Sequence, residues 1–147
     1  MSFTVYTIGF TKKTAREFFE RLRRAGVGKI VDVRLNNTSQ LAGFTKKEDL
    51  EYFAQTICGA SYHHMPALAP TPALLSKFKK AGGTWGEYER GFHDLMQERN
   101  AIEQLERSFF EEPACLLCSE DKPTHCHRRL VAEAMQKRWP DLRVLHL

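Results

Sequence analysis

The sequence predicts a single α/β domain over residues 1–147: a mostly parallel open sheet of about five strands, with helices on both faces and a helical insert before the fourth strand. Short runs rich in β-branched and apolar residues alternate with segments whose apolar residues recur at helical spacing. The connections between the runs are long enough for the crossovers that parallel strands require. A chain of 147 residues also has the size of one ordinary domain.

The start of the chain predicts a strand, a helix and a second strand. Residues 5–8 are β-branched or aromatic, which favours a strand. A helix follows, because Thr14 and Glu17 form a capping box ahead of apolar residues at helical spacing. Two glycines then end the helix, and residues 29–35 are expected to form the second strand.

The next unit is a second helix and a weaker strand. Thr45 and Glu48 form another capping box, and the helix that they begin is expected to end at Gly59. Residues 61–65 are polar for a buried strand, and Pro66 closes the run.

A helical insert separates this strand from the next one. Thr71 followed by Pro72 is typical of a helix start. Thr84 and Glu87 form a further capping box, and the helical stretch ends at Pro113 after a break near residue 100.

The end of the chain predicts strand, helix and strand. Residues 114–118 are a compact apolar run that suits a central strand. The last helix is expected to end at Trp139 and Pro140, and residues 143–147 close the chain as a strand.

Composition excludes several classes of protein. Apolar residues make up 42% and charged residues 27% of the chain, which argues against disorder and coiled coil. No apolar run approaches the ~18 residues of a membrane span, and the N-terminal residues lack the features of a signal peptide. We therefore expect a cytoplasmic protein whose four cysteines are thiols or ligands rather than disulfides. The net charge of +4 permits an anionic partner.

Polar residues gather where the predicted strands end. In an open parallel sheet, ligands bind beyond the carboxyl ends of the strands. The residues that fall late in a strand or just after one are Thr7, Gly9, Asp32, Arg34, His63, His64, Cys118, Ser119 and Glu120. We therefore expect one site at this rim of the sheet.

Asp32 and Arg34 are expected to project from the same face of their strand, because they are two residues apart. A charged pair inside a buried sheet must be satisfied by its partners or meet a ligand. Either the two form a structural ion pair, or Arg34 binds an anionic group while Asp32 orients it or acts as a base. The two interpretations can coexist.

The segment from Cys118 to Arg129 holds more potentially catalytic or ligand-binding side chains than any other part of the sequence. Thr124 is the expected N-cap of the last helix, which would place Cys126 in its first turn, where backbone N–H groups lower the pKa of a thiol. The alternative is that Cys126 packs on the sheet as a small apolar residue. Cys118 is either a second functional thiol or part of the core.

Six further residues are candidates for the site. Glu120 is an acid/base or a solvated loop carboxylate, and Arg128 binds an anion or is a surface cation. His63 is a surface histidine or a rim residue, and Ser39 follows Arg34 in a loop. Tyr88, together with Trp85, forms a stacking lid over a base or packs in the core. His127 completes the proposed substrate-binding residues.

A metal centre is not predicted. Cys115, Cys118, His125, Cys126 and His127 are residue types that bind zinc. However, the odd separation of the two strand cysteines sends them to opposite faces, and on a helix the two histidines would point about 200° apart. No phosphate-binding loop, dinucleotide motif or serine nucleophile elbow occurs either. We therefore expect no cofactor.

The chain resembles the family of bacterial and archaeal proteins described as domain of unknown function 488, over nearly its whole length. The resembling stretches are Tyr6–Gly9, Asp32–Arg34 with Ser39 and Phe44, Tyr62–Pro66, Leu117–Glu120, Cys126–Arg128 and Val144–Leu147. The resemblance implies a compact α/β domain. It also implies a site of Asp32, Arg34, Cys118, Glu120, Cys126, His127 and Arg128, without an established reaction. Two stretches depart from the family pattern, at Gln40 and at Leu68–Pro70.

The leading hypothesis is an enzyme that acts on an anionic substrate, a nucleotide or a nucleic acid, through thiolate or carboxylate chemistry at the rim. Asp32, Glu120, Cys118 and Cys126 are the predicted catalytic residues. The alternative is a non-catalytic module that binds nucleotides or nucleic acid. Neither hypothesis involves a membrane.

Overall fold

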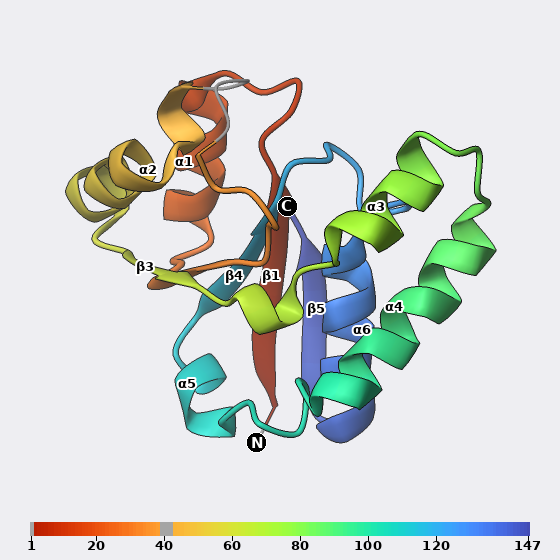
Figure 1. Ribbon diagram of the computed structural model, residues 1–147. Coiled ribbons are helices and arrows are strands. Elements are labelled where there is room, and N and C mark those ends of the chain that lie inside the picture. The colour runs from red at the N-terminus through yellow and green to blue at the C-terminus, as the bar shows by residue number, and fades with distance from the viewer. Residues whose placement is uncertain (1, 39–42) are drawn as a thin grey trace.

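The computed structural model describes residues 2–38 and 43–147 and contains one five-stranded sheet in the order β3-β2-β4-β1-β5. Every pair of neighbouring strands is parallel, which confirms the predicted fold class (Figure 1). The strands are β1 (Phe3–Gly9), β2 (Lys29–Asp32), β3 (Ser61–His64), β4 (Ala114–Cys118) and β5 (Leu142–His146). Strand β2 is shorter than the predicted 29–35, although the Val33 amide still bonds to Leu117 of β4.

Helices cover both faces of the sheet (Figure 1). They are α1 (Ala15–Arg24), α2 (Lys47–Phe53), α3 (Pro72–Lys79), α4 (Trp85–Arg99), α5 (Arg107–Glu111) and α6 (His127–Arg138). A π-helical turn (Ala54–Cys58) extends α2, and 3-10 turns occur at Gly43–Thr45 and Pro66–Leu68. No helix in the described part of the chain is both long and apolar enough to cross a membrane.

The two faces have separate cores. On one face, α1 and α2 bury Phe18 and Leu50 against Ile8, Cys115 and other sheet residues. On the opposite face, α4 and α6 pack on residues such as Leu116 and Cys118, and α3 lies against α4. The two cysteines of β4 therefore face opposite sides of the sheet, as their spacing predicts.

Most of the predicted helix starts are confirmed. Capping boxes begin α1 at Thr14 and α4 at Thr84, and the Thr71 side chain caps α3. The predicted capping box at Thr45 is wrong, because Thr45 ends a 3-10 turn and α2 has Lys46 as its N-cap, without a side-chain capping bond. The predicted N-cap at Thr124 is also wrong: α6 begins two residues later, after Cys126.

The Thr84→Ala variant is expected to lower the free energy of unfolding by about 1 kcal/mol, because the Thr84 hydroxyl accepts the Glu87 amide at the start of α4. Urea denaturation measures the change. Thr124→Ala is the matched control, since Thr124 is exposed and lies ahead of the observed N-cap. Equal losses in the two variants would contradict the assigned helix start.

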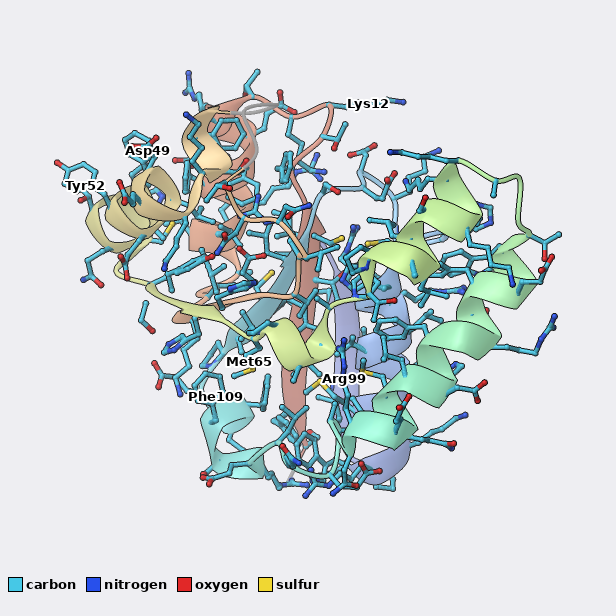
Figure 2. All side chains as sticks on the ribbon, viewed as in Figure 1. Lys12, Asp49, Tyr52, Met65, Arg99 and Phe109 are labelled. Carbon is cyan, nitrogen blue, oxygen red and sulfur yellow. The ribbon has the colours of Figure 1, made fainter. Side chains whose placement is uncertain are left out.

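Two structural features place the site at the carboxyl end of the sheet. Strands β1 and β4 are neighbours, yet the chain leaves β1 for α1 on one face and β4 for α6 on the other. Such a topological switch point opens a crevice between the two loops. In addition, Arg99 of α4 donates hydrogen bonds to the carbonyls of Ala67 and Ala69 (2.9 and 2.7 Å), which ties the insert to the turn after β3 (Figure 2).

Candidate functional site

A cavity of about 220 Å³ lies at this switch point. The segments that follow β1, β2 and β4 line one side of it, and α3 and α4 line the other. Six of the residues predicted for the site line this cavity: Arg34, Tyr88, Cys118, Glu120, Cys126 and His127. The fold thus brings together residues that are up to 93 positions apart in the sequence, from 34 to 127. This agrees with the rule that ligands bind beyond the carboxyl ends of parallel strands, which we call the strand-end rule.

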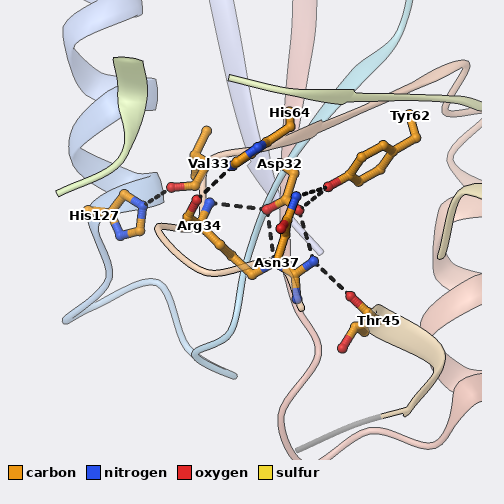
Figure 3. A network of polar contacts seen from close by, with 8 residues as sticks. All are labelled: Asp32, Val33, Arg34, Asn37, Thr45, Tyr62, His64 and His127. Atoms are coloured by element: carbon orange, nitrogen blue, oxygen red, sulfur yellow. Dashed lines mark hydrogen bonds and ion pairs between the residues drawn. The ribbon is translucent and has the colours of Figure 1, made fainter. Parts of the chain in front are cut away.

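Asp32 is the anchor of the polar network in Figure 3. Its carboxylate is fully buried and accepts Nε and Nη2 of Arg34 at 2.9 and 2.8 Å, as well as the Arg34 backbone amide at 3.1 Å. The Tyr62 hydroxyl donates to the same carboxylate at 2.5 Å. Burial raises the pKa of Tyr62, and the hydrogen bond to Asp32 raises it further, so the phenol stays a donor. Asp32 and Arg34 therefore form a structural ion pair.

Arg34 also has hydrogen-bond donors that the ion pair does not use. Burial opposes the guanidinium charge, but the hydrogen bonds and the charge of Asp32 outweigh it, and the pKa of Arg34 is raised. Nη2 donates a further bond to the Thr45 carbonyl at 2.7 Å. Nη1 is buried and has no hydrogen-bond partner among the described residues. Arg34 lines the cavity, and Nη1 is the one nitrogen of its guanidinium that no described group uses.

Cys118, Cys126 and His127 form a buried cluster. The two sulfurs and a ring nitrogen of His127 all lie within 4.8 Å of one another, and Nδ1 is 3.6 Å from the Cys118 sulfur. The other ring nitrogen, Nε2, is 2.6 Å from the Val33 carbonyl. Since a carbonyl only accepts, Nε2 carries a hydrogen, and in the tautomer with a single ring hydrogen the lone pair of Nδ1 faces Cys118.

The two thiols have opposite pKa shifts. A hydrogen bond from Cys126 lowers the pKa of Cys118 and outweighs the effect of burial; the charge of Arg128 acts in the same direction. Burial and that same hydrogen bond raise the pKa of Cys126 well above its usual value. The predicted depressed pKa of Cys126 is therefore wrong. Cys126 sits at the N-cap rather than in the first turn of α6, and its interaction with Cys118 favours the protonated thiol.

Thr7, Gly9 and Arg128 lie beneath the loop that follows β4. Arg128 is 1% exposed and donates to Thr7 Oγ1 at 3.2 Å and to the backbone carbonyls of Glu120 and Asp121. A Cβ atom on Gly9 would lie 1.5 Å from the Glu120 carbonyl oxygen. These three predicted substrate-binding residues therefore contact the protein itself. Their contacts hold in place the loop that brings Ser119 and Glu120 to the cavity.

Of the remaining candidates, Glu120 lies at the cavity and His63 lies away from it. The Glu120 carboxylate pairs with Lys79 of α3 at 2.7 Å, with both side chains nearly half exposed. His63 bonds to Ser61 at 2.8 Å and packs against Phe109 of α5, and it does not line the cavity. Its neighbour His64 contacts the Arg34 carbonyl at 3.0 Å. Ser39 lies outside the described residues.

One partner in the site is absent from the sequence-based prediction. Tyr62, interpreted from the sequence as a packing aromatic, donates a hydrogen bond to Asp32. The one feature that could have indicated this contact is the position of Tyr62 in β3, the strand next to β2. Trp85 and Tyr88, expected as a stacking lid or as core residues, form an aromatic wall of the cavity: their rings are nearly parallel, at 23° and 5.1 Å between ring centroids. Phe78 of α3 contacts both rings.

The fold and the site define a doubly wound parallel α/β protein with a buried cysteine–histidine cluster at its switch point. The family model described as "Domain of unknown function DUF488" matches residues 14–135, so the chain belongs to this family. Comparisons with curated proteins and with solved structures found no match.

Proposed function

We propose that the protein is an enzyme that acts on an anionic substrate with a planar ring, such as a nucleotide or an end of a nucleic acid, and that Cys118 supplies the reactive group. One observation carries the proposal: Arg34, the aromatic wall and the Cys118–His127 pair all line the same cavity. Anion recognition, ring stacking and a nucleophile would thus act on one bound molecule.

Recognition of the substrate would use two walls. Nη1 of Arg34, which lacks a partner among the described residues, would donate to a phosphate or carboxylate oxygen. Trp85 and Tyr88 would stack on the ring, because aromatic side chains accept any planar base on their faces. A cavity of about 220 Å³ is smaller than the sites of drug-sized ligands, so it suits one ring rather than a dinucleotide.

The chemistry would begin at the Cys118 sulfur. Nδ1 of His127, at 3.6 Å, can take the thiol proton, while the Nε2–H bond to the Val33 carbonyl holds the ring in that orientation. The sulfur would then form a bond to an electrophilic atom of the substrate, and the bond from that atom to the leaving group would break. Glu120, which also lines the cavity, would exchange a proton with the leaving group once its pair with Lys79 opens.

Substrate protection tests this proposal. Metal-free protein is alkylated with iodoacetamide in the presence of a panel of nucleoside monophosphates or inorganic phosphate, and each cysteine is quantified by mass spectrometry. At least one nucleotide is expected to slow labelling of Cys118 by about tenfold or more while leaving Cys58 unchanged, because Cys58 lies outside the cavity. Arg34→Lys, which keeps the charge but loses the planar fork, is expected to weaken the protection.

No protection by any member of the panel would argue against an anionic ring substrate. The non-catalytic alternative rests on the same aromatic wall and predicts ligand binding without turnover. Under that alternative, nucleotide affinity would fall with salt and would be the same in Cys118→Ser, and no covalent or chemical change in the ligand would be detected.

A further inference from the structure

We propose that Cys118, Cys126 and His127 also form a binding site for a single thiophilic divalent metal ion such as Zn²⁺. The three donor atoms come from the end of β4 and the start of α6, and their side chains are 3–7% exposed. The sequence-based argument against a metal site depends on Cys115 and His125, which are considered there as possible ligands. Those two residues are indeed directed elsewhere: Cys115 packs in the core of the opposite face, and the His125 ring contacts Trp85.

The distances fit a tetrahedral ion. Bonds of about 2.3 Å from zinc to sulfur and about 2.0 Å from zinc to nitrogen imply a sulfur-to-nitrogen separation of about 3.5 Å at a tetrahedral angle. The Cys118 sulfur lies 3.6 Å from Nδ1 of His127. Cys126 completes the trio within 4.8 Å, so only a small movement of its sulfur is needed to reach the same ion.

An independent observation concerns the second nitrogen of His127. Histidines that bind metals usually donate their other ring N–H to a carbonyl or carboxylate, which fixes the tautomer and the ring orientation. Nε2 of His127 makes this bond to the Val33 carbonyl at 2.6 Å, and the ring packs against Phe92. The lone pair of Nδ1 is therefore directed at the two sulfurs before any ion binds.

The charge and the accessibility of the cluster also suit such an ion. Two thiolates and a neutral imidazole together neutralise a divalent cation, and binding would release the thiol protons. All three residues line the cavity, so the fourth coordination position would face it and be open to water or a ligand. A bound ion would occupy the sulfur lone pair that the proposed thiol chemistry requires. Metal binding and alkylation should therefore exclude one another, whether or not the cavity accepts a nucleotide.

Metal titration of the full-length protein, freed of metal with a chelator, tests the site. One equivalent of Co²⁺ is expected to produce near-ultraviolet sulfur-to-cobalt charge transfer and visible bands of tetrahedral cobalt, and one equivalent of Zn²⁺ is expected to displace it. Cys126→Ser and His127→Gln should each weaken binding by more than about 100-fold. Cys115→Ser is the matched control, because Cys115 is equally buried on the same strand but faces away.

A second measurement on the unaltered protein covers variants that fail to fold. Zn²⁺ is expected to suppress alkylation of Cys118 and Cys126 and to leave Cys58 unaffected. Charge transfer that survives in both ligand variants, or alkylation that Zn²⁺ does not change, would overturn the metal site. Neither result would bear on nucleotide protection, which is measured on metal-free protein.

Discussion

Replacing Asp32 by alanine is expected to lower the free energy of unfolding by about 3–5 kcal/mol, because it leaves the charge of Arg34 buried without a counter-ion. Arg34 is only 4% exposed, so water cannot replace the lost carboxylate. Three donors lose their acceptor at once: the guanidinium, the Arg34 amide and the Tyr62 hydroxyl. Urea denaturation at neutral pH measures the loss.

Two comparisons show whether the loss comes from the buried pair. Tyr62→Phe removes a single bond to the same carboxylate and should cost about 1.5–3 kcal/mol. Asp141→Ala breaks a partly exposed ion pair with Arg107 and should change stability far less, since water solvates the charge that remains. A loss in Asp32→Ala no larger than that in Asp141→Ala would show that the Asp32–Arg34 pair does not stabilise the fold.

The same pair illustrates how far the sequence predicts the site. The spacing of Asp32 and Arg34 predicts that they interact, and the strand-end rule predicts that Arg34 meets Cys118 and Cys126. Both expectations are confirmed by the ion pair and by the shared cavity. These features depend only on strand periodicity and on the parallel arrangement of the strands, which the alternation of elements in the sequence indicates strongly.

Other features depend on shifts of one or two residues that patterns do not resolve. The start of α6 after Cys126 rather than after Thr124 removes Cys126 from the first turn and reverses the expected shift of its pKa. For the adjacent His63 and His64, strand alternation predicts that the two side chains point to opposite faces of the sheet. It does not predict which of them lies closer to the site. Helix boundaries and the choice of face are set by tertiary packing.

The part of Phe78 in the aromatic wall and the role of Arg128 could not be predicted for a different reason. The strand-end rule concerns the loops of the sheet, whereas Phe78 comes from an insert whose position depends on its packing against the domain. Arg128 is typical of an anion-binding residue in sequence, yet its guanidinium is surrounded by carbonyls and a hydroxyl of the protein. Its partners are fixed by how closely β1 approaches the loop after β4.

That close approach makes Gly9→Ala the second variant with a large expected effect. The new Cβ atom would lie 1.5 Å from the Glu120 carbonyl oxygen and 2.9 Å from Nη1 of Arg128, so the loop must move away from β1. Overpacking of this kind is expected to lower the free energy of unfolding by about 3 kcal/mol or more. Gly9 pairs in register with Cys118, so the movement would also displace the sulfur that the proposed chemistry and the proposed metal site both use.

Urea denaturation and Co²⁺ titration measure the two consequences separately. Gly86→Ala is the matched control: its Cβ atom would meet nothing closer than 3.7 Å, and alanine favours a helix over glycine by about 1 kcal/mol. We expect this control to be neutral or stabilising and to bind Co²⁺ normally. If Gly9→Ala were equally stable and bound Co²⁺ equally well, the contact between Gly9 and Glu120 would not hold the loop. The loop would then be held by its hydrogen bonds from Arg128 and Thr11.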